Sequence, residues 1–189
     1  MKIISGKFKG RIIQMPKGIR PTSDKVRESL FEILKGRIEE TKFLDLYCGS
    51  GAIGIEAFSR GAEAITFVDD NINCIKTLKK NLSLLGISQS SSVNICHRMA
   101  LKILEVFEET KAVFDIIFLD PPYYKGLAKN TLIAISNYAI LARNAIIIAE
   151  IYKKEELPED VGVLRQFRIC KYGDTKLVFY KIKPPPPRG

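Results

Sequence analysis

The 189-residue sequence lacks the features of a membrane, secreted or metal-binding protein. It contains no apolar run that reaches the roughly 18 residues of a membrane-spanning helix, so we expect no membrane contact. Its first residues carry no long apolar core, and we therefore expect no secretory signal. Its four cysteines are widely spaced and form no Cys-x-x-Cys pair, which is typical of reduced thiols in a cytoplasmic protein. Its single histidine, His97, has no Cys or His partner at metal-ligand spacing, so no metal site is predicted.

Acidic residues are nearly absent from both ends of the chain, although the whole sequence contains 21 of them against 30 basic residues. Residues 1–20 contain six basic residues and no acidic one, and residues 165–189 contain seven basic residues and one acidic one. Folding does not require such a segregation, whereas a polyanion such as a nucleic acid favours a basic edge. A solvated basic surface without a partner is the alternative. The candidate contacts with the polyanion are Lys7, Lys9, Arg11, Arg20 and Arg27.

Apolar runs alternate with helical segments along the middle of the chain. We predict strands at 43–48, 64–69, 93–97, 114–119 and 145–151, and helices at 52–60, 72–85, 101–110 and 127–141. Strand–helix alternation with short connections implies right-handed crossovers and a mostly parallel sheet. Two further strands, 163–171 and 176–182, follow each other without an intervening helix, which predicts a hairpin. The predicted fold class is therefore α/β, with a mostly parallel seven-stranded sheet that ends in an antiparallel C-terminal hairpin.

The N-terminal segment is expected to be a small extension of this domain. The apolar pairs Ile3-Ile4 and Ile12-Ile13 predict a short β-hairpin over residues 2–15, and a helix is expected from residue 24. The predicted division is a basic extension over 1–20, a domain over 21–183 and a flexible proline-rich tail over 184–189. Because the extension is short and basic, we expect the domain to fold without residues 1–14.

A glycine-rich turn follows the first strand of the alternating region. Its sequence is Asp45-Leu46-Tyr47-Cys48-Gly49-Ser50-Gly51-Ala52-Ile53-Gly54, and a helix follows it. Gly49 and Gly51 allow a tight turn and the close approach of a ligand, and Gly54 allows close packing of the helix. About 20 residues further on, Asp69 and Asp70 end the next strand, where an acid binds ribose hydroxyls. The unit predicts a cofactor that contains ribose.

Two classes of cofactor fit this unit. An NAD enzyme places a pyrophosphate at the helix N-terminus, but the sequence offers no poised histidine for hydride transfer. An S-adenosylmethionine enzyme instead needs an acid near the end of the first strand, facing the positively charged methionine moiety. Asp45 supplies such an acid.

A proline-rich turn after the fourth of these strands favours the second class. Its sequence is Asp120-Pro121-Pro122-Tyr123, and the two prolines remove backbone donors and stiffen the turn. Asp120 and a proline carbonyl form an acceptor pair for an N–H₂ group, and the ring of Tyr123 offers a flat face to a base. A strand-end turn that caps a helix is the structural alternative.

These motifs resemble those of a known family. The turn at 120–123 is similar to the (Asp/Asn)-Pro-Pro-(Tyr/Phe) motif of S-adenosylmethionine-dependent amino-methyltransferases, and the turn at 45–51 is similar to their first cofactor motif. The stretches Gly6-Lys7-Phe8-Lys9-Gly10-Arg11 and Arg20-Pro21-Thr22-Ser23-Asp24-Lys25-Val26-Arg27-Glu28-Ser29-Leu30-Phe31 resemble, more specifically, the bacterial 16S rRNA guanine-N2 methyltransferases (the RsmD family). The resemblance extends from residue 2 to about residue 182.

The resemblance implies a Rossmann-like class I methyltransferase, a cytoplasmic monomer that transfers a methyl group from S-adenosylmethionine to the N2 amine of a guanine. The implied substrate is 16S rRNA in an assembled or assembling small subunit. N6-adenine methylation of DNA or RNA stays open, because the same acceptor pair serves an adenine amine. The expected catalytic residues are Asp120, Pro121, Pro122 and Tyr123. The expected cofactor-binding residues are Asp45, Tyr47, Gly49, Ser50, Gly51, Asp69, Asp70, Met99 and Ala100.

Overall fold

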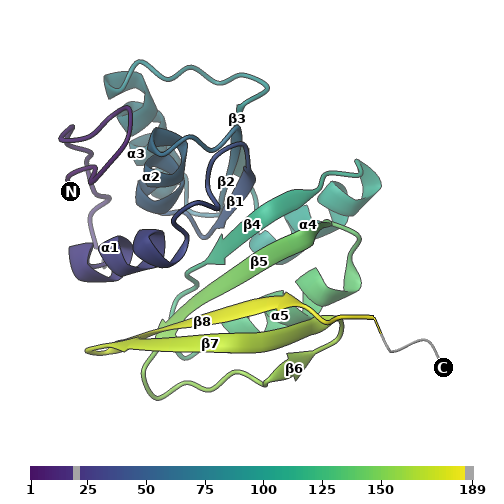
Figure 1. Cartoon of the computed structure of the whole chain (residues 1–189). Helices are drawn as coiled ribbons and strands as arrows, with labels where there is room; N and C mark the ends of the chain where they lie inside the picture. The colour runs from purple at the N-terminus through teal and green to yellow at the C-terminus, as the bar shows by residue number, and fades with distance from the viewer. Residues whose placement is uncertain (19–21, 186–189) are drawn as a thin grey trace.

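The computed structural model describes residues 1–18 and 22–185 (Figure 1). Its centre is an eight-stranded sheet with the strand order β3-β2-β1-β4-β5-β8-β7-β6. The strands are β1 Lys42–Leu46, β2 Ala64–Asp69, β3 Val93–His97, β4 Phe114–Leu119, β5 Leu141–Tyr152, β6 Asp160–Val161, β7 Leu164–Tyr172 and β8 Thr175–Ile182. The helices are α1 Asp24–Ile33, α2 Ala52–Ser59, α3 Ile72–Leu84, α4 Ala100–Glu109 and α5 Leu127–Asn137. The first five strands pair in parallel and the rest antiparallel, which confirms the predicted fold class.

The sheet differs from the prediction at its C-terminal side. All seven predicted strands are present, and β6 adds an eighth that pairs over two residues with the start of β7. A two-residue strand is too short to produce an alternating pattern in the sequence. The strand β5 begins at Leu141 rather than at residue 145, and α5 ends at Asn137 rather than at residue 141. The boundary moves because Tyr138 already has an extended backbone, with φ −99° and ψ 145°.

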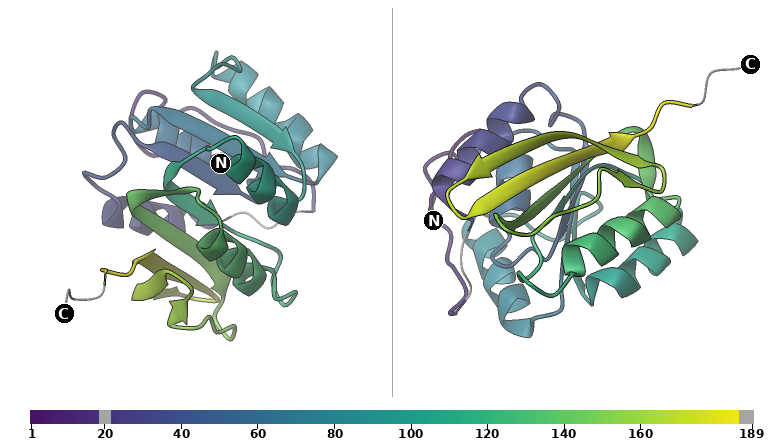
Figure 2. Two further views of the ribbon diagram at one scale, coloured as in Figure 1. Left: turned by 90° about the vertical axis from the view of Figure 1, so that its right-hand side faces the viewer. Right: turned by 90° about the horizontal axis from the view of Figure 1, so that it is seen from below.

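Helices cover both faces of the sheet (Figure 2). The helices α1, α2 and α3 pack on one face through fully buried side chains such as Leu30, Ile55 and Leu78. The helices α4 and α5 pack on the other face, where Leu104 and Leu132 are fully buried. The result is a three-layer α/β/α arrangement with an apolar core on each side of the sheet. Within the described ranges, no helix combines the length and the apolar character needed to cross a membrane.

The order of the parallel strands produces a switch point between β1 and β4. The strand β1 pairs with β2 on one side and with β4 on the other. In such sheets ligands bind at the carboxyl ends of the strands, next to the point where the order reverses. Asp45 lies near the end of β1, Asp69 ends β2, and Asp120 directly follows β4. The topology therefore brings three carboxylates to one edge of the sheet.

The N-terminal segment does not form the predicted two-stranded hairpin. An isolated bridge between Lys2 and Ile12 joins its two halves, supported by a hydrogen bond of 2.9 Å from the Ile3 N–H to the Arg11 carbonyl. Ile3 and Ile13 are each 1% exposed and belong to the same core as α2 and α3. Residues 5–10 form bends and turns, so the ladder does not extend beyond this bridge.

Two buried polar side chains hold this segment on the helices. The N–H groups of Ile4 and Ser5 donate to the Glu56 carboxylate of α2 at 2.8 and 3.0 Å. The Gln14 N–H donates to Asn81 Oδ1 of α3 at 2.7 Å. Glu56 and Asn81 are both fully buried, so the segment is part of the core.

Candidate active site

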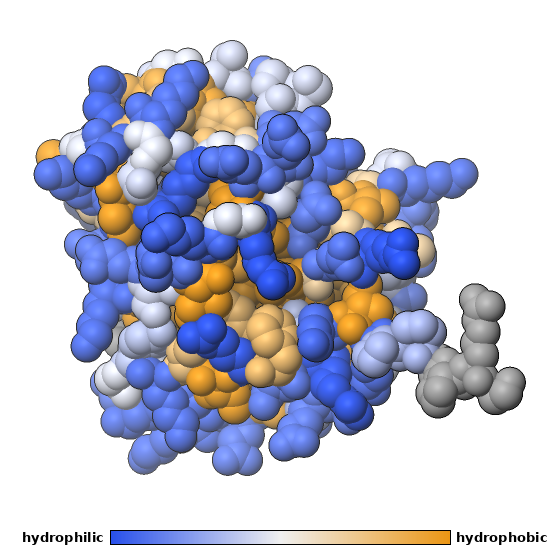
Figure 3. Space-filling model, viewed as in Figure 1, coloured by the Kyte–Doolittle hydropathy of each residue, from blue (hydrophilic) through white to orange (hydrophobic). Residues whose placement is uncertain are grey.

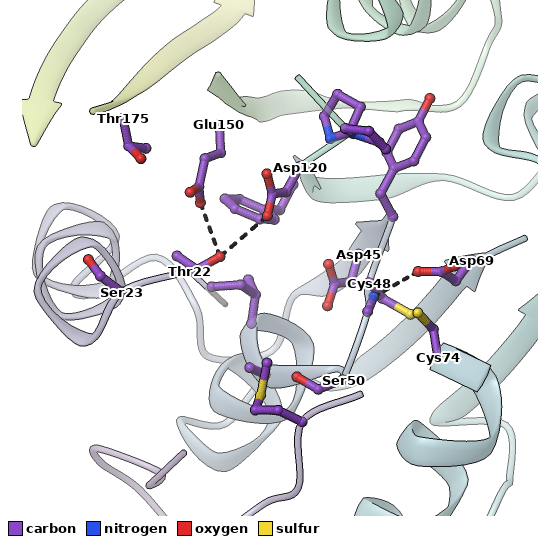
Figure 4. Close-up of a pocket in the computed structure, with 18 of the residues that line it drawn as sticks. Thr22, Ser23, Asp45, Cys48, Ser50, Asp69, Cys74, Asp120, Glu150 and Thr175 are labelled. Atoms are coloured by element: carbon purple, nitrogen blue, oxygen red, sulfur yellow. Dashed lines mark hydrogen bonds between the residues drawn. The ribbon is translucent and has the colours of Figure 1, made fainter. Parts of the chain in front are cut away.

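A cavity of about 740 Å³ lies at the carboxyl ends of β1, β2 and β4 (Figure 4). Its size falls within the range of roughly 300–1,000 Å³ that is typical of small-molecule sites. The predicted site residues that line it are Asp45, Tyr47, Gly49, Ser50, Asp69, Asp70, Asp120, Pro121, Pro122 and Tyr123. The structure thus brings the glycine-rich turn and the proline-rich turn to one cavity, as the topology requires.

Three predicted cofactor residues are not among those that line the cavity. Gly51 has φ 79°, and a Cβ at this position would lie 2.3 Å from Leu78 Cδ1, so packing against α3 requires a glycine here, and its contact with a cofactor stays a prediction. Met99 precedes α4 with 59% of its surface exposed, and Ala100 is buried in the first turn of that helix. Gly49 is the open glycine of the turn, because a Cβ there would meet no atom within 4 Å.

Asp45 is a buried carboxylate at the end of β1, with 2% of its surface exposed. It accepts a hydrogen bond of 2.9 Å from the Gly54 N–H, and the absence of a Cβ at Gly54 allows that approach. Burial raises the pKa of Asp45 to about 8, and the nearby negative charges of Asp120 and Asp69 add to this effect. A cation in the cavity would reverse the shift, so the site is suited to a positively charged group next to Asp45.

Asp69 fixes the glycine-rich turn from the neighbouring strand. Its Oδ2 accepts the Gly49 N–H at 2.8 Å (Figure 4). Its Oδ1 accepts the Asn71 N–H at 2.9 Å. A carboxylate has about four acceptor sites, which leaves capacity for ribose hydroxyls. Tyr47 has φ 62°, and its hydroxyl lies 2.8 Å from the Thr131 Oγ1 of α5. These contacts hold the turn in a defined shape.

The proline-rich turn places an acceptor and an aromatic ring at the end of β4. Asp120 is joined to the end of β1 by a hydrogen bond of 3.4 Å from its N–H to the Leu46 carbonyl. The Tyr123 hydroxyl lies 3.3 Å from Thr175 Oγ1 at the start of β8. The Tyr123 ring is 5.8 Å from the ring of Tyr152, centroid to centroid. The contact of the hydroxyl group and the contact of the ring together orient Tyr123.

Two residues that the sequence prediction missed complete this part of the cavity. Glu150 of β5 is 3% exposed, and Thr22 precedes α1. The Thr22 hydroxyl lies 3.4 Å from Asp120 Oδ2 and 3.2 Å from Glu150 Oε2, so both carboxylates face it (Figure 4). A glutamate inside the apolar run 145–151 was the available signal, because strands buried on both faces rarely carry a charge.

Of the five predicted polyanion contacts, three are exposed, one is buried and one lies outside the described residues. Lys7, Lys9 and Arg11 are exposed, and Arg11 also donates from Nη2 to the Leu84 carbonyl at 2.9 Å. Hydrophilic side chains cover most of the face of the molecule that Figure 3 shows. Arg27 is fully buried instead, so the prediction that it contacts the polyanion is wrong. Arg20 lies outside the described residues.

Arg27 is buried among partners that bind one of its nitrogens and offset its charge, while among the described residues its Nε and Nη1 have no hydrogen-bond partner. Its Nη2 donates to the Lys2 carbonyl and to Asp24 Oδ1, each at 2.7 Å. Its Nη1 lies 4.0 Å from Glu56 Oε2, and Glu56 is also buried. Arg27 therefore joins α1 to the N-terminal segment and to α2.

The sequence matches a known family over most of its length. That family is described as Conserved hypothetical protein 95, and its sequence model matches residues 1–181. The chain belongs to this family.

Two relatives and one solved structure agree with this assignment. The chain is 39% identical over 183 residues to a candidate rRNA methyltransferase of Bacillus subtilis (strain 168), YlbH, with 96% of this chain and 98% of that protein covered. It is 38% identical over 157 residues to Ribosomal RNA small subunit methyltransferase D of Buchnera aphidicola, with 82% and 80% covered. The structure of a candidate methyltransferase of Escherichia coli, yhhF, superposes with a TM-score of 0.81 at 30% identity, over 97% of this chain and 98% of that chain. These matches confirm the resemblance that the motifs predicted.

Proposed function

We propose that this chain transfers a methyl group from S-adenosylmethionine to the exocyclic N2 amine of a guanine in 16S rRNA, in the cytoplasm. The observation that carries the proposal is one cavity that holds both Asp45, suited to a cation, and Asp120, suited to an amine. Membership of a family with relatives named as small-subunit rRNA methyltransferases supports the substrate class. We propose an assembled or assembling small subunit as the form in which the RNA is presented.

The cavity fits S-adenosylmethionine at its two polar ends. Asp45 provides a buried carboxyl group that becomes negatively charged beside the methionine amino group, and Asp69 provides acceptors for the ribose hydroxyls. Gly49 allows close approach of the backbone between them. When bound, S-adenosylmethionine supplies a methyl group on a positively charged sulfur, which is the electrophile of the reaction.

The residues around Asp120 then orient and activate the amine. The N2 lone pair of guanine is delocalised into the ring, so the amine is a poor nucleophile. The Asp120 carboxylate and the Pro121 carbonyl accept hydrogen bonds from its two N–H groups, which localises the lone pair on nitrogen. The amine loses one proton when it is methylated, and Asp120 or water accepts that proton. The Tyr123 ring stacks on the base and fixes its plane. Holding the reacting atoms in line contributes roughly 7–11 kcal/mol in well-oriented reactions.

The target base must leave its stack in the RNA to enter the cavity, which favours an unpaired or opened site as the substrate.

Methyl transfer from labelled S-adenosylmethionine to small subunits that lack the modification tests the proposed function. Digestion of the RNA to nucleosides and mass analysis should identify N2-methylguanosine. Identification of N6-methyladenosine instead would establish the alternative activity, since the same acceptor pair serves an adenine amine. No transfer to small subunits or to naked 16S rRNA would contradict both.

S-adenosylhomocysteine carries the same amino group as S-adenosylmethionine. Its binding is expected to release up to one proton from Asp45 at pH 7. Burial holds the pKa of Asp45 at about 8, so without a neighbouring cation this carboxyl group is mostly protonated at pH 7. A neighbouring ammonium group lowers that pKa, so the proton leaves and affinity rises with pH up to about pH 8. Calorimetry in two buffers with different ionisation enthalpies measures the number of protons released. Asp45→Asn should abolish the release, and an observed heat that is independent of the buffer in the parent protein would exclude this role for Asp45.

The N-terminal basic residues are expected to bind the RNA backbone. Reversing Lys7, Lys9 and Arg11 together to Glu should raise the KM for RNA far more than the KM for the cofactor, since no cofactor contact is proposed there. Each lost phosphate contact should reduce the slope of log affinity against log salt by about 0.7–0.9. A matched triple reversal of Lys102, Lys129 and Arg143, on α4, α5 and the start of β5, is the control. Equal RNA affinity of the two triple variants would leave the N-terminal residues as a solvated edge.

A further inference from the structure

Three tyrosine rings form a cluster where β4 and β5 end, and the proposed reaction uses Tyr123 alone. The ring of Tyr123, which lines the cavity, lies 6.4 Å from the ring of Tyr124 and 5.8 Å from that of Tyr152, centroid to centroid. The rings of Tyr124 and Tyr152 are 5.1 Å apart. All three distances fall within the roughly 4.5–7 Å of interacting aromatic pairs. The cluster therefore extends outward from the cavity.

Tyr124 is the outermost member of this cluster. It is 69% exposed, whereas Tyr123 and Tyr152 are half-buried. Its backbone has φ 63°, a conformation that is costly for a residue with a bulky side chain. A glycine adopts this φ without strain, so the turn itself does not require a tyrosine. Strain of this kind is concentrated at functional sites, where a contact with a ligand compensates for it.

Glu155 fixes the position of the exposed ring. Its Oε1 accepts the Tyr124 N–H at 3.2 Å, and its Oε2 accepts the Tyr152 N–H at 3.1 Å. One carboxylate therefore joins the turn after β4 to the end of β5 and holds the two residues next to each other. On the other side of Tyr152, Asp174 forms an ion pair of 2.6 Å with Lys153. The ring of Tyr124 is thus held in place before any ligand binds.

An exposed, fixed aromatic ring next to a cavity for a nucleobase is suited to a second base. When the target base leaves its stack, the base next to it loses a stacking partner. Aromatic side chains replace such partners, and they accept every base because each base has a flat face. The rings of Tyr123 and Tyr124 are nearly perpendicular, at 88°, so bases stacked on them are turned relative to each other, as in an extruded nucleotide and its neighbour. The exposed Lys125 adds a cation for the RNA backbone.

We propose that Tyr124 stacks on the nucleotide next to the target in the substrate RNA, while Tyr123 stacks on the target base. The inference rests on the proposed function and extends it by naming the group that replaces the stacking lost on extrusion. Stacking of the neighbouring base stabilises the RNA with its target extruded, so it raises kcat/KM for RNA and leaves the affinity for the cofactor unchanged.

Removal of the neighbouring base tests this directly. The methylated nucleotide is first located by mass analysis of RNA fragments. 16S rRNA is then ligated with a nucleotide that lacks its base, on the 5′ or on the 3′ side of the target, and reconstituted into small subunits. For the parent enzyme, kcat/KM should fall about tenfold or more with one of these two substrates, as expected for the loss of one stacked base.

The variant Tyr124→Leu keeps an apolar side chain but removes the flat ring, so it should lower kcat/KM for the complete substrate about tenfold. With the substrate that lacks the neighbouring base, the same variant should cost less than about twofold, because the stacked pair is already lost. Tyr124→Phe keeps the ring and should respond to the missing base as the parent does. Tyr138→Leu is the matched control, since it makes the same change after α5, at the opposite end of β5 from the cavity.

A second variant distinguishes lost stacking from a damaged fold. Tyr124→Gly removes the ring and also relieves the backbone strain at φ 63°. It should keep a urea midpoint near that of the parent and should bind S-adenosylhomocysteine with the parent affinity. Its kcat/KM for RNA should nevertheless fall as far as that of Tyr124→Leu.

The outcomes separate the inference from the proposed function. If the parent enzyme methylates the RNA and uses both base-deleted substrates as well as the complete one, no neighbouring base is stacked and the inference fails alone. This comparison needs no variant. The inference also fails if the effects of Tyr124→Leu and of the missing base multiply, which would assign Tyr124 to another part of the particle, such as a protein. If the parent enzyme transfers no methyl group to RNA, the proposed function fails and the inference fails with it.

Discussion

Asp120→Ala is expected to reduce turnover by about 10³-fold or more while the affinity for S-adenosylmethionine changes by no more than a few-fold. Asp120 faces the cavity from the end of β4, within 3.4 Å of the Thr22 hydroxyl, and it is assigned to the amine rather than to the cofactor. Its removal takes away the acceptor that orients the amine and draws on its proton, and such groups contribute 10²–10⁴-fold in general. Single-turnover methyl transfer at saturating cofactor measures the first effect, and calorimetry with S-adenosylhomocysteine measures the second.

Two further variants test whether the loss of turnover is due to the carboxylate of Asp120. Asp120→Asn keeps a carbonyl acceptor without the charge, so it should retain more activity than Asp120→Ala. Glu109→Ala removes an exposed carboxylate at the end of α4 and should leave both quantities unchanged. An Asp120→Ala enzyme with turnover close to that of the parent would remove Asp120 from the chemistry and would transfer the role of acceptor to the Pro121 carbonyl or to water.

The sheet and the acids at the strand ends can be predicted from the sequence. The strands follow from local apolar runs, and the position of the acids follows from the rule that ligands bind at the carboxyl ends of parallel strands. Asp45, Asp69 and Asp120 each follow or end an apolar run, and the carboxyl ends of parallel strands meet at one edge. Knowing the order of five strands is enough to place these acids together. The same reasoning places Tyr123 beside them, since it lies in the turn after β4.

The residues that the sequence prediction missed or misplaced depend on contacts between distant segments. Thr22 and Glu150 meet across 128 positions of sequence, and no local pattern brings a loop before α1 to the end of β5. Arg27 looks like a surface cation on an amphipathic helix, but Glu56 on another helix and the Lys2 carbonyl make its burial tolerable. The role of Gly51 likewise depends on Leu78 of α3, which fills the space where a side chain would be.

Removal of residues 1–14 is expected to unfold the protein or leave it marginally stable, in contrast to the expectation from charge alone. Ile3 and Ile13 are each 1% exposed, and burial of an isoleucine contributes about 1.5–3 kcal/mol. Glu56 and Asn81 would lose backbone partners while buried, at a cost of roughly 1–3 kcal/mol each. The sum is comparable to the whole stability of a typical domain, about 5–15 kcal/mol.

Unfolding by urea, followed by circular dichroism, measures this loss, and binding of S-adenosylhomocysteine reports on the cavity. The full-length double variant Ile3→Ala, Ile13→Ala is the matched comparison, because it removes the apolar contacts but keeps every charge and backbone donor. It should fold with a clearly lower urea midpoint, whereas the triple reversal of Lys7, Lys9 and Arg11 should keep a midpoint near that of the parent. A truncated chain with the parent midpoint and intact ligand binding would contradict this account. In that case the core of α2 and α3 would be complete without Ile3 and Ile13, and the N-terminal segment would serve the RNA alone.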